Sequence, residues 1–197
     1  MRWDRLFDDL ESQLEQELGA EEVDLAVEEE RLRLGRLSLR DRLAAMAGPG
    51  EAARGPLLVE TVAGAALPVR VDAVGRDWIA GELAVEGARR SAVVPLAAVA
   101  AVRPGPERLA AGLLPAPAVP VASLSSRLGL VFVLRDLCRR RVVVTVETVR
   151  GARHGTIDRV ARDHLDLAEH DPGEPRRSDA VHGVRLLPLA AIDHLRY

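Results

Sequence analysis

The residues of this sequence that could do chemistry are its five histidines, its acidic residues and its single cysteine. His164 and His170 are candidate metal ligands, because four acidic residues lie near them in the sequence: Asp163, Asp166, Glu169 and Asp171. On a strand, however, His164 and Asp166 share one face while Asp163 belongs to the other. No cysteine pair and no His-Glu-x-x-His motif accompanies them. We therefore expect a solvated strand face, with no metal and no other cofactor.

Covalent catalysis finds equally little support in the sequence. Cys138 falls on the apolar face of a helix expected around Leu128, Val131 and Leu134, where a thiol packs instead of attacking. The pair Ser125-Ser126 falls in the cap of that helix and not in a nucleophile elbow. No glycine-rich phosphate-binding loop occurs. We predict that the protein is not an enzyme. A single cysteine also excludes an intramolecular disulfide and suits a reducing cytoplasm.

Arginine supplies all the fixed positive charge, because every one of the 27 lysine-or-arginine positions holds arginine. Several arginines could gather on one rim of the fold, where guanidinium groups would hold phosphates. The candidate nucleic-acid-binding residues are Arg139, Arg140, Arg141, Arg153, His154, Arg176, Arg177 and Trp78. Two features oppose this interpretation: the net charge is −3, and aromatic residues, which stack on bases, make up only 3% of the chain. Nucleic-acid binding therefore remains the alternative function.

The elements that must carry these residues occur twice in the chain. The first copy opens with Val59-Glu-Thr-Val and the second with Val146-Glu-Thr-Val. Both copies also close alike. Residues 93–103 read Val-Val-Pro-Leu-Ala-Ala-Val-Ala-Ala-Val-Arg, and residues 186–196 read Leu-Leu-Pro-Leu-Ala-Ala-Ile-Asp-His-Leu-Arg. Two long matches in the same order indicate a duplicated domain.

Each copy has the pattern of a small, strongly bent sheet. Residues 142–147 alternate in a β-branched run that suits a pleated strand. Gly151 marks a turn, and Gly155 sits where a barrel strand must bend. Further strands are expected around residues 156–160, 164–168, 184–187 and 194–197. Five short strands in about fifty residues predict a closed barrel, because closure removes exposed edges.

The N-terminal region has a different character. Apolar residues recur there at helical spacing on one stripe: Trp3, Leu6, Phe7, Leu10, Leu14 and Leu18. Residues 1–50 carry 13 acids and 7 Arg, a net charge of −6, whereas residues 51–197 are net +3. We expect this stripe to pack on the chain's own barrel, and the second interpretation is an acidic arm that binds a partner or a second copy of the chain. The predicted organisation is a helical arm (1–50), barrel 1 (51–103), a Pro/Ala-rich linker (104–121), and a helix with barrel 2 (122–197).

These motifs resemble a known family. A helix, a Val-x-Val strand, a glycine turn, Gly-x-Ile-x-x-Val, Asp-His-Leu-x-Leu and a closing Leu-Pro-Leu-x-x-Ile are similar to the Sm-like fold of LSm and Hfq proteins, and Gly75-Arg-Asp-Trp-Ile79 fits the bacterial variety. The whole chain also resembles a set of bacterial proteins that begin Met-Arg-Trp-x-x-Leu-Phe-x-Asp-Leu-Glu. The resemblance implies an α+β fold with two five-stranded small β-barrels, each preceded by a helix. It also implies RNA binding and assembly through edge strands.

The chain departs from that family in two ways. It contains no asparagine, which RNA-binding Sm proteins use after the start of the third strand. Val69, preceded by Pro68, replaces Gly155 in the first copy. We therefore predict a non-enzymatic interaction and assembly scaffold that acts through barrel edges and the acidic arm. The alternative is RNA or DNA binding through the arginine-rich rim of the second barrel.

The same reading leads to expectations about partners and location. We expect a homo-oligomer, a dimer or larger, and the N-terminal helix is the candidate site for a protein partner. The apolar run from Leu128 to Leu134 is too short to cross a bilayer, and the N-terminus is acidic, so we expect a cytoplasmic protein without membrane insertion.

Overall fold

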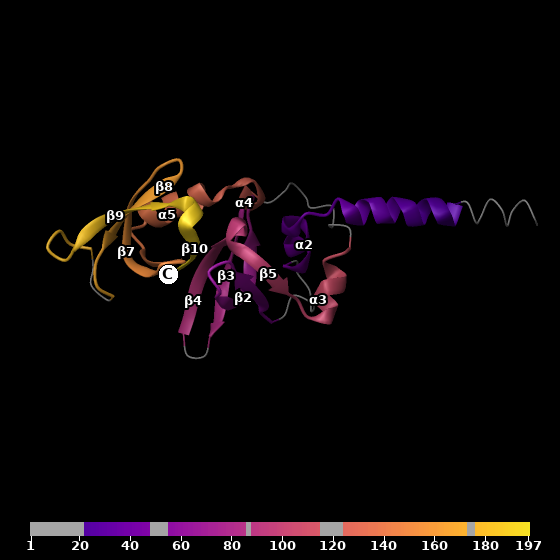
Figure 1. Cartoon of the computed structure of the whole chain (residues 1–197), viewed down its shortest axis with the longest axis horizontal. Helices are drawn as coiled ribbons and strands as arrows, with labels where there is room; N and C mark the ends of the chain where they lie inside the picture. The colour runs from indigo at the N-terminus through magenta and orange to yellow at the C-terminus, as the bar shows by residue number, and fades with distance from the viewer. Residues whose placement is uncertain (1–21, 48–54, 86–87, 115–123, 173–175) are drawn as a thin grey trace, which may run out of the picture. The chain divides into compact units, whose positions relative to one another are not determined.

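The computed structural model describes residues 22–47, 55–85, 88–114, 124–172 and 176–197 of the chain (Figure 1). The chain divides into two compact units, Met1–Ser38 and Leu39–Tyr197. In the first unit, residues 22–35 are helical, and apolar side chains such as Val23 and Leu25 are exposed. The predicted interaction stripe from Trp3 to Leu18 lies outside the described residues.

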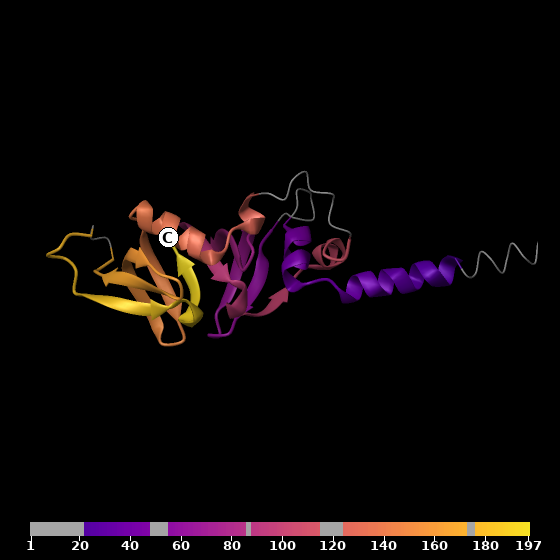
Figure 2. The ribbon, with the colours of Figure 1, turned by 90° about the horizontal axis from the view of Figure 1, so that it is seen from above.

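The second unit is built on one antiparallel sheet (Figures 1 and 2). Its described strands are β1 (Leu57–Thr61), β2 (Ala66–Val74), β3 (Trp78–Val85), β4 (Ala88–Pro95), β5 (Val99–Arg103), β6 (Val143–Thr148), β7 (Gly151–Val160), β8 (His164–Glu169), β9 (Gly183–Pro188) and β10 (Ile192–Arg196). They lie in the order β5-β1-β2-β3-β4-β10-β6-β7-β8-β9. The helices are α2 (Leu39–Met46), α3 (Pro106–Ala111), α4 (Leu124–Arg127) and α5 (Leu130–Arg139), with 3-10 turns η2 (Leu96–Ala98) and η3 (Leu189–Ala191).

The prediction of two five-stranded Sm-like barrels is wrong. A closed barrel in the first half would need the outer edge of β4 to close within that half. Instead, β4 pairs with β10, with Val93 opposite Leu195 and Ala92 opposite Arg196. Because β10 occupies this edge, the two halves join into one open ten-stranded sheet in the described part of the chain. The keywords that followed from a barrel, Sm-like, LSm and Hfq-like, are wrong for the same reason.

Local signals nevertheless explain the individual strands. The β-branched alternation that suggested a strand at residues 142–147 forms β6, in which Val144 and Val146 are fully buried. The glycine expected in the following turn, Gly151, has φ +98°, a conformation that side chains disfavour. β7 begins at that glycine, five residues earlier than the strand expected from Thr156.

Two hydrophobic cores lie against the sheet. One gathers Leu43 and Met46 of α2 with β1–β4 residues such as Val59 and Ile79. The other contains Leu134 and Leu137 of α5 and buried apolar residues of β6–β10, such as Val146 and Leu167. This second core also includes Trp78 and Val93, which come from the first half of the sheet. The halves therefore share packed side chains as well as a hydrogen-bonded edge.

Candidate functional site

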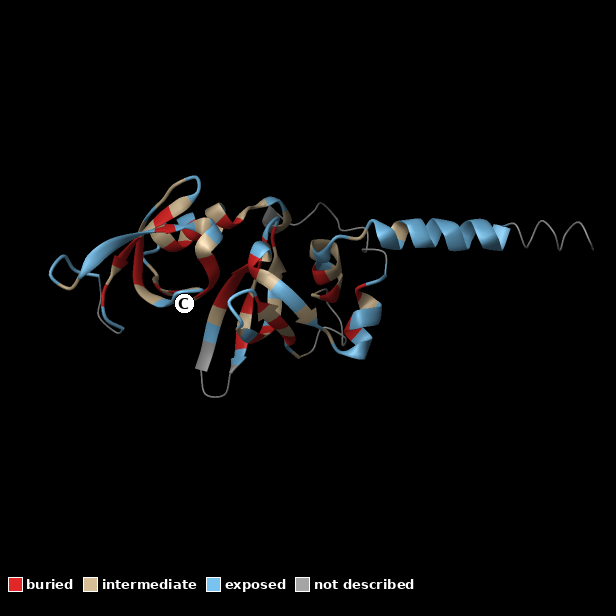
Figure 3. Cartoon of the chain, in the orientation of Figure 1, coloured by how far each residue is buried: buried red, intermediate tan, exposed pale blue. Residues whose placement is uncertain are grey.

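Strand β9 forms one end of the sheet and is the most exposed strand of the second half (Figure 3). It pairs with β8, with Leu186 opposite Asp166, and β8 is its one neighbour in the strand order. Val184 and Leu186 are 57% and 65% exposed, although their strand belongs to a well-packed sheet. An edge strand presents unpaired backbone N–H and C=O groups, which can template the addition of another strand. Two exposed apolar side chains therefore lie on a strand that, among the described residues, pairs on one side only.

Charge at this edge is locally compensated. The guanidinium of Arg185 donates to both carboxylate oxygens of Glu169, at 2.7 and 3.1 Å. Arg153 lies 4.0 Å from the same carboxylate. Such exposed ion pairs contribute little stability, but they hold the Arg185 side chain toward β8. The outer side of β9 is thus not blocked by a free charge from Arg185.

The opposite end of the sheet is strand β5. It pairs with β1, with Val59 opposite Val102, and an ion pair between Arg103 and Glu60 at 2.7 Å reinforces that pairing. Ala100 and Ala101 are exposed. β5 therefore offers a second row of edge groups, lined by small side chains.

Between these ends, the pairing of β4 with β10 forms an internal joint, which comprises Ser91–Val93 and Leu195–Tyr197. Ser91 and Tyr197 exchange two backbone hydrogen bonds of 3.1 and 3.0 Å. Val93 and Leu195, which lie opposite each other, are fully buried. The joint satisfies an edge of each half and covers an apolar pair.

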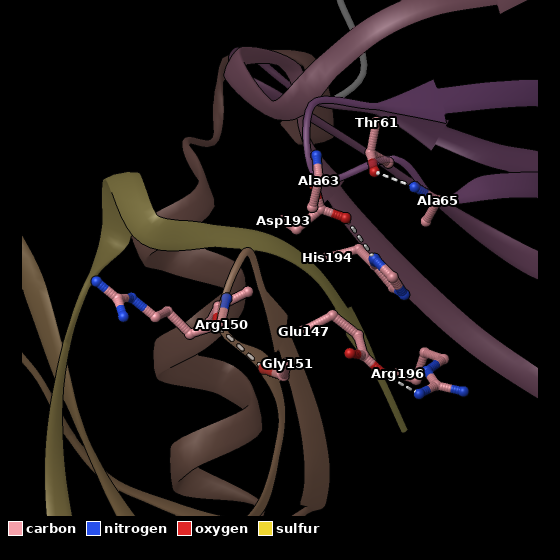
Figure 4. Close-up of polar contacts among 10 residues, drawn as sticks. Thr61, Ala63, Ala65, Glu147, Arg150, Gly151, Asp193, His194 and Arg196 are labelled. Atoms are coloured by element: carbon pink, nitrogen blue, oxygen red, sulfur yellow. Dashed lines mark hydrogen bonds and ion pairs between the residues drawn. The ribbon is translucent and has the colours of Figure 1, made fainter.

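A buried acid and histidine anchor β10 beside this joint (Figure 4). Asp193 is 2% exposed and accepts a hydrogen bond from the backbone N–H of Ala63 at 3.1 Å, in the turn between β1 and β2. Its other carboxylate oxygen lies 2.9 Å from Nδ1 of His194, which is 4% exposed. Sequence reasoning did not select these residues. The sequence does set these two residues apart, because the first copy has Ala100 and Ala101 at the positions that match them.

The candidate nucleic-acid-binding arginines are brought together in pairs by carboxylates. Asp136 accepts from Arg139 and Arg140 at 2.6 and 3.4 Å. Its pKa is lowered, first because of the hydrogen bond from Arg139.

A second carboxylate binds the next two arginines of the set. Asp158 accepts from Arg141 at 2.9 Å and from Arg176 at 2.6 Å, and the hydrogen bond from Arg176 is the main cause of its lowered pKa. Arg177 is exposed. Among the described residues, every predicted phosphate-binding arginine except Arg177 lies within 4.0 Å of a carboxylate.

Of the two ring-bearing residues of the predicted set, one is buried and the other is half-buried. Trp78 is 5% exposed, and its Nε1 donates to the backbone oxygen of Leu128 at 2.9 Å. His154 is half-buried, with Nδ1 3.1 Å from the hydroxyl of Thr145. Burial lowers the pKa of His154, and neighbouring His170 lowers it further. A base stacking on Trp78 would have to displace core packing, because its ring belongs to the core of the second half.

The histidines considered for a metal site are separated by their partners. His164 lies 2.8 Å from Asp163, while His170 is buried with Nε2 3.0 Å from the hydroxyl of Thr156. Among the described residues, no group of three or more His, Cys, Asp or Glu is placed to hold a metal ion.

Comparisons with family models, curated proteins and solved structures find no match to this chain. Within the described part of the chain, no helix combines the length and apolar character needed to cross a membrane.

Proposed function

We propose that this protein is a non-enzymatic interaction and assembly scaffold, and that its binding element is the free outer edge of β9. The observation that carries the proposal is the exposure of Val184 and Leu186 on a strand with one neighbour in the sheet. Addition of a strand there would pair backbone groups and cover the two apolar side chains at once. Strand addition of this kind takes affinity from the backbone and specificity from alternate side chains.

The alternative, phosphate binding by the arginine set, draws less support from the geometry. Asp136 and Asp158 each hold two of the arginines concerned, so a phosphate would have to compete with carboxylates already in contact. Trp78 is committed to the core. The edge of β9 needs no such displacement.

The test is site-specific photo-crosslinking in cells, with the photoreactive amino acid placed at position 184. We expect adducts that protease removes and nuclease does not, and we expect Leu186→Arg in the same chain to abolish them. The control position is 132, because Phe132 is also exposed, at 54%, but lies on α5. Nuclease-sensitive adducts, or adducts equally strong from position 132, would contradict the proposal.

A further inference from the structure

The two halves of the sheet have the same internal order, which makes their edges comparable residue by residue. The first half runs β5-β1-β2-β3-β4 and the second β10-β6-β7-β8-β9. Val59 pairs with Val102 in the first half, as Val146 pairs with Leu195 in the second. η2 and η3 occupy matching places, directly before β5 and β10. β9 is therefore the counterpart of β4, and β5 is the counterpart of β10.

The internal joint connects a β4 edge to a β10 edge. In the part of the chain that the structure describes, the sheet edges without a neighbouring strand are those of β9 and β5, the counterparts of the two edges already joined. Resting on the proposed function, we infer that the strand added to β9 is β5 of a second copy of this chain. The internal joint is the template for that contact, which is head-to-tail and repeats from copy to copy.

The exposed apolar residues of β9 agree with this template. Leu186 of β9 matches Val93 of β4, because each lies two residues before the proline that ends its strand. Their partners also match, since Leu186 lies opposite β8 as Val93 lies opposite β3. Val93 is fully buried, opposite Leu195 of β10, whereas Leu186 is 65% exposed. The residue of β5 that corresponds to Leu195 is Val102. Docking β5 on β9 would therefore bring Val102 opposite Leu186.

The outer joint lacks two features of the internal one. Asp193, which binds the N–H of Ala63, is replaced by Ala100. Tyr197, whose N–H donates to Ser91, corresponds to Pro104, which has no N–H to donate. Contacts between copies should accordingly be weaker than the internal joint and should depend on protein concentration.

The template also indicates how to weaken or strengthen the outer joint from the β5 side. Arg150 holds the position of Ala63 in the turn that Asp193 contacts. Ala100 of the incoming copy would approach that turn. Ala100→Arg would place like charges together, and Ala100→Asp would supply both an acceptor and an opposite charge. Ala100 is exposed in the single chain, so both variants should fold.

The experiment is sedimentation of the full chain from low to high micromolar concentration. We expect the wild-type mass to rise with concentration, and Leu186→Arg and Ala100→Arg each to weaken association about tenfold or more. Ala100→Asp should strengthen it, and Phe132→Arg should leave it unchanged. A mixture of Leu186→Arg and Ala100→Arg chains should stop at two copies, because each retains one intact edge.

The outcomes separate this inference from the proposed function. A strict monomer would overturn β5 as the partner while leaving β9 as the binding edge. The same conclusion would follow if Ala100→Arg associates like the wild type while Leu186→Arg does not associate. Association unaffected by either variant would overturn this inference and exclude β9 from self-assembly. In that case the crosslinks from position 184 decide the proposed function separately.

Discussion

Two residues distinguish the joined edge strand from its free counterpart. Asp193 and His194 are buried in β10, while Ala100 and Ala101 stand exposed in β5. A buried carboxylate is tolerated where its oxygens are hydrogen-bonded, and here the N–H of Ala63 and the imidazole of His194 provide those contacts. The polar pair therefore fixes β10 against one particular turn.

Replacing Asp193 by Ala should lower the free energy of unfolding by about 1–3 kcal/mol, because the Ala63 N–H and the buried imidazole both lose their acceptor. Urea unfolding followed by circular dichroism measures the change. Asp179→Ala, at an exposed position, is the matched control. Equal stability of the two variants would contradict an anchoring role.

Stability should also depend on pH through His154. Burial is the largest cause that lowers the pKa of His154 below its ordinary value of 6.5. His170 lowers this pKa further, while Asp171 raises it. The unfolded chain then binds more protons than the folded one near that pH, so stability rises with pH. The contribution is complete above pH 6.5 and is lost as the pH falls below it toward the folded pKa.

The measurement is the free energy of unfolding between pH 7.5 and about 5. His154→Gln should flatten the decline toward acid, because the group whose pKa burial lowers is then absent. An unchanged slope in His154→Gln would refute this assignment.

At the scale of elements, strands could be located from the sequence, but the partner of β4 could not. Alternating β-branched residues and glycine turns are local signals, and they led to β6 and to Gly151. Two strand edges pair through backbone groups, which are the same in every residue, so the sequence does not show which edges pair. The barrel prediction was wrong for this reason. Asp193 and His194 were likewise visible as departures between the copies, but their burial depends on the internal joint.

At Gly155 the strands β7 and β8 approach so closely that no side chain fits, a constraint that the sequence suggested only in part. Gly155 was expected at a bend, and the structure shows why a side chain is excluded there. A Cβ atom on Gly155 would lie 2.1 Å from the backbone oxygen of Ala168, so β7 and β8 would have to separate. The close approach falls beside the irregular pairing between Ile157 and Arg159.

Gly155→Ala should therefore destabilise the protein by about 1–3 kcal/mol, in the range of overpacked sites. Thermal unfolding reports the effect as a lower Tm. Gly183→Ala is the control, because a Cβ there meets nothing within 4 Å. A Tm for Gly155→Ala equal to that of the control would show that the strands adjust freely.

At the scale of the whole molecule, the shared core couples the two halves. Trp78 and Val93 from the first half pack with α5 and β6–β8 of the second. Neither half can unfold without exposing side chains that the other covers. We expect residues 39–197 to unfold in one cooperative step.

In a Trp3→Phe background, Trp78 is the single tryptophan. Its fluorescence and the far-ultraviolet circular dichroism should then show coincident urea transitions. A second transition seen by circular dichroism alone would mean that the halves unfold separately. The helix at residues 22–35 belongs to the other compact unit and contributes to the circular dichroism baseline.

Because the internal joint lies within one polypeptide, its formation does not depend on the concentration of the protein. A tether raises the effective concentration of one edge around the other to the order of millimolar, so the joint stays closed at any dilution of the protein. The edges of β9 and β5 have no such tether and experience only the bulk concentration of the chain. If copies of the chain pair as inferred above, one pairing geometry gives a permanent connection within the molecule and a concentration-dependent one between molecules.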